Sequence, residues 1–165
     1  SAYYTDYSMG KFIDEAKKEA WFDNTLFIFV ADHSHNSYKN LAMSNPEYQK
    51  IPLLFYGNVI DSAWRGKTIS HLGVQTDIAA TLLGQLNMNA TAYPWSKNLL
   101  NPFSPEFAYT SYEEGFAWKR PIGAISYEKR FDRLHYNNTP PMAKDSILQE
   151  GKAFLQVLFQ EYMDQ

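Results

Sequence analysis

The stretch that decides the fold is Thr25-Leu26-Phe27-Ile28-Phe29-Val30-Ala31, followed at once by Asp32-His33. The run is apolar and lacks the alternation of a half-buried strand, and it is rich in aromatic and β-branched residues. Such a run is typical of a strand buried on both faces within a parallel sheet. A helical pattern comes directly before it, and a helix that leads into a buried strand indicates an α/β fold.

Other periodic segments extend this interpretation. Apolar residues at three-and-four spacing predict helices over 5–20 and 74–86, and a broad apolar face predicts a long final helix that starts from a cap at Asp145 or Ser146. A short apolar run over 52–56 predicts a second strand of the main sheet. Short aromatic segments separated by turns predict a smaller antiparallel sheet; they span 107–112, 116–118, 123–127 and 130–136. The predicted fold is therefore a mainly parallel sheet with flanking helices, then a small antiparallel sheet and a long terminal helix.

Composition excludes several classes of function. The 165-residue chain has a net charge of −3, so it offers no basic face for a polyanion, and we expect no nucleic-acid partner. It has no cysteine, which excludes disulfides and thiolate metal sites. No apolar run approaches the ~20 residues needed to span a bilayer. The 12 Tyr, 11 Phe and 4 Trp indicate either a large core or an aromatic interface or pocket wall.

Asp32 and His33 are the strongest candidates for chemistry. In open α/β sheets, ligands bind outside the carboxyl ends of the strands, where this pair is expected to lie. A carboxylate beside an imidazole suits Zn²⁺ or Mn²⁺. The alternative is a polar loop start, in which Asp32 caps the next turn and His33 only packs.

Four segments, taken in order, form a recognisable set: Tyr4–Phe12, Trp21–His33, Ile51–Gly57 and Gln75–Leu83, which together cover roughly the first 90 residues. They resemble the sulfatase-like family that contains lipoteichoic acid synthase and related phosphoglycerol transferases, within the alkaline phosphatase superfamily. In that family a helix ends at an Asp-Asn-Thr turn, enters a strand and finishes on an Asp-His metal pair. The later family helix has the pattern Asp-Ile-x-x-Thr-Leu-Leu.

The resemblance implies that Asp32 and His33 are ligands of a catalytic divalent cation, Mn²⁺ or Zn²⁺, with one or two ions bound. It places His35 in the metal-proximal loop, where a second ion or a substrate phosphate would lie. His71 precedes the second helix, where some relatives have another metal-binding histidine, although Gln75 stands at the matching position here. Otherwise both are ordinary loop residues. Outside this group, His135 is expected to be structural.

The family's nucleophile and its other acidic metal ligand lie upstream of the Asp-His segment. The residues before Asp32 have no room for them, because they form one predicted helix and one strand. We therefore expect this chain to be the C-terminal segment of a longer enzyme, and to be inactive by itself. Lys119 and Arg120 are candidates for contact with an anionic substrate, or members of a solvated turn.

Three functions are consistent with these features. The first is a fragment of a metal-dependent phosphoglycerol- or phosphoethanolamine-type transferase or phosphodiesterase. The second is a fragment of a true sulfatase, and the third is a non-catalytic module that binds a glycan or a protein through its aromatic surface. The substrate of the parent enzyme would be a phospholipid headgroup or another phosphate or sulfate ester.

The predicted organisation is a C-terminal half of a sulfatase-like α/β core over 1–100, and a small sheet with the final helix over 101–165. The truncated face of the core is expected to favour self-association. From the resemblance alone, the parent is expected to be anchored in a membrane with this domain outside the cytoplasm.

Overall fold

The computed structural model describes residues 2–35 and 40–164. The chain forms two compact units: unit 1 consists of segments 1–32 and 51–68, and unit 2 consists of segments 33–50 and 69–165. Helices and sheets are mixed in the order predicted, and the α/β class is confirmed. The division at residue 100 remains a prediction.

Unit 1 contains two helical segments and a two-stranded ladder. They are α1 (Ala2–Ala16), the short 3₁₀ segment η1 (Phe22–Asn24), β1 (Phe27–Val30) and β2 (Leu53–Tyr56). The ladder is antiparallel, with Phe27 opposite Tyr56 and Val30 opposite Leu53, whereas we predicted that both strands would belong to a mainly parallel sheet. A parallel pair needs a crossover, usually a helix, and the described residues between β1 and β2 form none.

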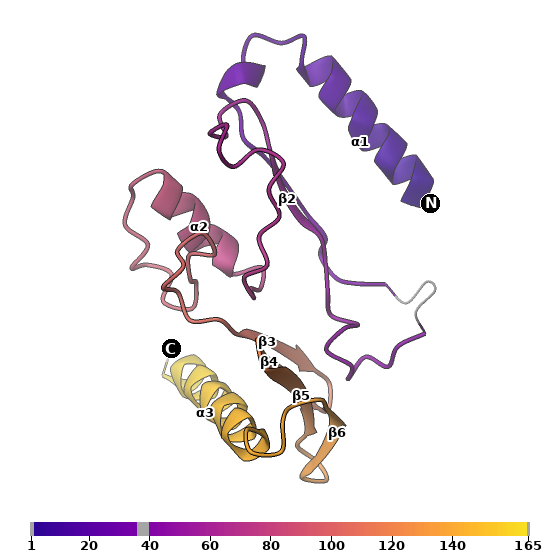
Figure 1. Cartoon of the computed structure of the whole chain (residues 1–165), viewed down its shortest axis with the longest axis vertical. Helices are drawn as coiled ribbons and strands as arrows, with labels where there is room; N and C mark the ends of the chain where they lie inside the picture. Colours follow the sequence, from indigo (N-terminus) through magenta and orange to yellow (C-terminus); the bar gives the residue numbers. More distant parts are fainter. Residues whose placement is uncertain (1, 36–39, 165) are drawn as a thin grey trace. The chain divides into compact units, whose positions relative to one another are not determined.

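Phe27 is the centre of the packing in unit 1. Its ring centroid lies 6.0 Å from that of Phe12 on α1, 5.6 Å from that of Phe22 and 6.3 Å from that of Tyr56 on β2. Figure 1 shows α1 and the ladder at the indigo and purple end of the chain. Val30 is nevertheless 43% exposed, so the prediction of a strand buried on both faces does not hold within this chain. The aromatic contacts gather around Phe27, near one end of the ladder.

Asp77 holds α2 (Asp77–Gln85) in unit 2. Its side chain is 1% exposed and forms an ion pair with the ammonium of Lys97. The backbone N–H of Lys97 also donates to Asp77 Oδ1 at 3.0 Å. One turn further along the helix, the hydroxyl of Thr81 accepts a hydrogen bond from the backbone N–H of Leu99 at 2.9 Å. These bonds fasten the segment after α2 to the helix, and they satisfy a buried charge that would otherwise be costly.

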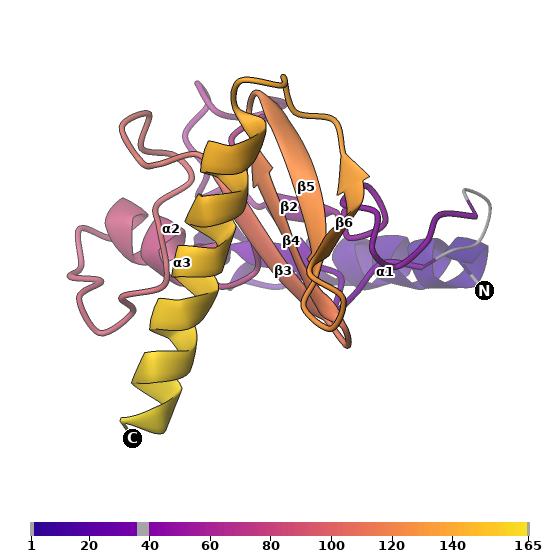
Figure 2. The same ribbon diagram turned by 90° about the horizontal axis from the view of Figure 1, so that it is seen from below.

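The small antiparallel sheet and the long terminal helix are confirmed. The sheet is a meander with the order β3-β4-β5-β6, and α3 lies along one of its faces (Figure 2). Unlike the prediction, α3 is not capped by Asp145 or Ser146: Asp145 lies inside the first turn, and the cap position is Ala143, which makes no side-chain cap. The bounds are β3 (Ala108–Tyr112), β4 (Gly115–Arg120), β5 (Gly123–Glu128), β6 (Arg133–Asn137) and α3 (Lys144–Met163).

The main core lies between this sheet and α3. Phe116 stands opposite Tyr127 and Trp118 opposite Ile125, and because paired residues of an antiparallel ladder share a face, these four side chains form one surface. Ile147 of α3 packs against them.

Gly151 brings the backbone of α3 against this surface. A Cβ atom at this position would collide with the ring of the fully buried Phe116 and would lie 3.1 Å from Trp118 Cβ. The packing of the helix on the sheet therefore requires glycine at this position.

We expect Gly151→Ala to lower the free energy of unfolding by about 1–3 kcal/mol, because an overpacked core must shift to accept the methyl group. Thermal and urea denaturation followed by circular dichroism would measure it. Gly10→Ala is the matched control: Gly10 lies in α1 with no atom within 4 Å of an added Cβ. That change should stabilise α1 by about 0.5–1 kcal/mol. Equal effects of the two substitutions would contradict the packing described for Gly151.

Candidate metal centre

Asp32 and His33 follow the end of β1 after a single residue, Ala31. Both side chains are exposed. Asp32 is the last residue of the first segment of unit 1, and His33 is the first residue of unit 2. The position of the pair after an apolar strand agrees with the sequence, while its role as a ligand pair remains a prediction.

The backbone beside His33 orients its ring. Nδ1 of His33 lies 2.8 Å from the carbonyl oxygen of Ser34, and since a carbonyl only accepts, Nδ1 is the donor in this bond. In a neutral imidazole the proton is then on Nδ1, and Nε2 has the lone pair. Metal-binding histidines usually donate their other ring N–H to such an acceptor. The local geometry therefore fits a ligand that binds through Nε2.

The two remaining histidine candidates differ in their surroundings. His35 is exposed and precedes residues 36–39, which lie outside the described part of the chain. His71 has a buried Nε2 that finds no hydrogen-bond partner among the described residues. A buried ring nitrogen without a partner is costly, and it suits a metal or substrate ligand. His71 thus fits a binding role, but its membership of one site with His33 and His35 remains a prediction.

Glu47 ties the polar segment after His33 to the small sheet, a role that sequence patterns did not reveal. Its Oε1 pairs with the ammonium of Lys119 on β4 at 2.7 Å, and its Oε2 pairs with that of Lys50 at 2.6 Å. The hydrogen bonds from Lys119 and Lys50 lower the pKa of Glu47 to about 2 from its ordinary 4.5. The partners are 72 residues apart, so only the fold brings them together.

Lys119 and Arg120, the basic candidates for substrate contact, are both engaged within the protein. Lys119 binds Glu47, while Arg120 pairs with Glu150 on α3 at 3.4 Å and donates to the carbonyl oxygen of Glu106 at 3.1 Å. Their positive charges therefore serve contacts of the small sheet with neighbouring segments.

None of the helices in the described part of the chain is long and apolar enough to cross a membrane.

Comparison with known proteins gives two findings. Residues 1–88 match the family model described as Sulfatase, and this range contains Asp32, His33, His35 and His71. The chain is also similar in fold to a protein of the alkaline phosphatase superfamily from Vibrio parahaemolyticus, solved as a crystal structure, with 22% sequence identity and a TM-score of 0.68. The match covers 96% of this chain but 41% of that protein, so this chain spans less than half of the protein it resembles.

Acid should weaken the ion pairs that Glu47 forms with Lys119 and Lys50. Because the folded-state pKa is depressed, the stabilisation is complete above pH 4.5 and is lost as the pH falls through about 2. Glu47→Gln should therefore lower the free energy of unfolding at pH 7 by up to about 1 kcal/mol, since the pair is partly exposed. The difference from the unsubstituted chain should shrink steadily between pH 4.5 and pH 2 in urea denaturation series. A difference that persists unchanged at pH 2 would show that the carboxylate charge is not the cause.

Proposed function

The chain belongs to the sulfatase family, and we propose that it is the C-terminal segment of a phosphoglycerol- or phosphoethanolamine-type transferase or phosphodiesterase. The observation that carries the proposal is the position of Asp32-His33 directly after β1, in a family segment where the His33 ring is held with Nε2 as its acceptor nitrogen. Enzymes of this family act on esters, which agrees with a phosphate-ester substrate. The finer assignment to lipoteichoic acid synthase-like transferases rests on the segments from Tyr4 to Leu83 that resemble that group.

In this proposal Asp32 and His33 bind a divalent cation, Mn²⁺ or Zn²⁺. Asp32 contributes negative charge, and His33 contributes a neutral imidazole whose tautomer is set by the carbonyl of Ser34. When bound, the cation lowers the pKa of a nucleophilic hydroxyl and neutralises charge on the phosphoryl oxygens. His71 and His35 are the residues that would bind a second ion or a substrate phosphate. The orphaned Nε2 of His71 supports this role.

The nucleophile and the remaining metal ligands are proposed to come from the part of the parent enzyme that precedes this segment. The same part would cover apolar side chains that unit 1 leaves exposed, such as Tyr3, Tyr4 and Phe12 of α1. In the separate chain this surface favours self-association. We further propose, from the family resemblance, that the parent is anchored in a membrane and that this domain works outside the cytoplasm.

The proposal can be tested by measuring the activity of variants of the parent enzyme. Asp32→Asn and His33→Gln should each lower kcat/KM for bis(4-nitrophenyl) phosphate by about 10²-fold or more, because loss of a ligand costs metal affinity and charge stabilisation. Asp145→Asn is the matched control, since Asp145 is an exposed carboxylate in the first turn of α3. Full activity of the Asp32 and His33 variants would refute the metal assignment. A preference for 4-nitrophenyl sulfate over the phosphate diester would instead identify a true sulfatase.

The 165-residue chain alone should hydrolyse neither substrate, with or without added Mn²⁺ or Zn²⁺, because two ligands from one dipeptide provide no nucleophile and an incomplete coordination sphere. Product release measured at high protein concentration would test this. Turnover that depends on Asp32 would show that the active site is complete within these residues.

A further inference from the structure

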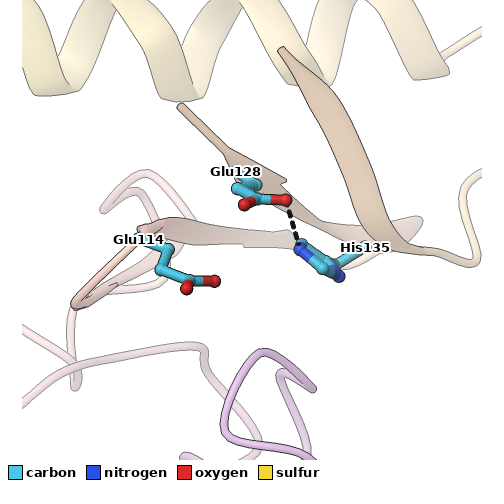
Figure 3. Close-up of side chains that lie close together, drawn as sticks. All are labelled: Glu114, Glu128 and His135. Carbon is cyan, nitrogen blue, oxygen red and sulfur yellow. Dashed lines mark hydrogen bonds and ion pairs between the residues drawn. The ribbon is translucent and has the colours of Figure 1, made fainter. Parts of the chain in front are cut away.

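Three side chains with metal-binding atoms converge at one end of the small sheet. Glu114 lies in the turn between β3 and β4, Glu128 is the last residue of β5, and His135 lies in β6. One donor atom from each lies within 4.8 Å of the others. Figure 3 shows the Glu114 carboxylate pointing toward the other two side chains. The sheet register produces the group, since Gly115, next to Glu114, is paired with Glu128, and the β6 strand that contains His135 begins opposite Glu128.

Glu128 is buried and fixed in place by its neighbours. Its side chain is 2% exposed, and its Oε2 accepts hydrogen bonds from Arg133 Nε at 2.8 Å and from His135 Nε2 at 2.7 Å. Both of these bonds end on the same oxygen, Oε2. Buried charges in proteins are paired or coordinate metals, so a buried carboxylate beside other metal-binding side chains is a suitable ligand for a cation.

The charges in the group do not balance. Glu114 and Glu128 contribute two negative charges, and Arg133 is the one arginine or lysine paired with either of them among the described residues. The Glu114 carboxylate makes no ion pair with a described residue. Arg133 compensates one of the two carboxylate charges, and the donor atoms of the two carboxylates lie within 4.8 Å of each other. Carboxylates this close together repel unless a cation lies between them.

We propose that Glu114, Glu128 and His135 form a second divalent-cation site, of the kind that Zn²⁺ prefers. Zn²⁺ binds carboxylate oxygens and imidazole nitrogens, and sites with three protein ligands keep water in the fourth position. The buried Glu128 supplies a preorganised oxygen, and the exposed Glu114 and His135 close on the ion by small movements of side chains. To bind the ion, Nε2 of His135 would give up the proton that it donates to Glu128, which moves to Nδ1 or to solvent, and would offer its lone pair to the metal.

Such an ion would join three elements at this end of the sheet: the β3–β4 turn, β5 and β6. Its role is to brace the small sheet. The proposal does not depend on the catalytic assignment of Asp32 and His33, because it uses none of the same residues.

The test is isothermal titration of the 165-residue chain with ZnCl₂ in a D32N/H33Q background, which removes the first candidate pair. In that background the chain should bind one Zn²⁺. Glu114→Gln and His135→Gln should each weaken the affinity by about tenfold or more. Glu113→Gln is the matched control, because Glu113 is the exposed neighbour of Glu114 in the same turn but lies outside the group. The Zn²⁺ affinity of the Glu113→Gln chain should stay within about twofold of that of the D32N/H33Q chain, which is the scatter expected of surface substitutions.

Thermal unfolding supplies a second readout. Saturating Zn²⁺ should raise the Tm of the D32N/H33Q chain, since a ligand that binds only the folded state stabilises it. Glu114→Gln should remove this rise while leaving the metal-free Tm nearly unchanged. Absence of Zn²⁺ binding in the D32N/H33Q chain would overturn the proposal, and so would binding that neither substitution weakens. Loss of catalysis in the parent after Asp32→Asn would bear only on the other site.

Discussion

The packing of α3 on β4 and β5 is the constraint on which unit 2 depends. The helix comes close to the sheet because Gly151 has no side chain to collide with Phe116, and that approach lets Ile147 join the buried cluster. With this contact made, Arg120 at the end of β4 lies within reach of Glu150 on the helix. The sheet then fixes the positions of Lys119 and Glu128. Lys119 forms an ion pair with Glu47, and Glu128 forms one with Arg133.

These ion pairs differ in strength because they differ in burial. The pair of Glu47 with Lys119 is partly exposed, so it orients the polar segment after His33 more than it stabilises the fold. Asp77 with Lys97 is buried and fully hydrogen bonded, and losing either partner would leave a charge without compensation. Glu128 is buried, and its carboxylate lies close to that of Glu114, an arrangement that a cation between them would stabilise.

Much of the fold could be predicted from local patterns. The segments for α2, α3, β1, β2 and the meander were found because apolar spacing reports helices, and aromatic runs between turns report strands. The direction of pairing was not predictable: the run from Phe27 to Val30 reads as a buried parallel strand by its composition, yet it pairs antiparallel with Leu53–Tyr56. Which strands pair, and in which direction, depends on the connection between them, which composition does not encode.

The sequence by itself determined the family and the identity of the first candidate ligands, because Asp32-His33 is a contiguous motif that needs no folding to be recognised. It also determined the layout of the small sheet and the last helix. Only the tertiary structure decided that His71 has an orphaned nitrogen, that Glu47 meets Lys119, and that Glu114, Glu128 and His135 converge. These features involve residues that are far apart in the sequence or depend on their surroundings. They arise only once strand register and packing have brought distant segments together.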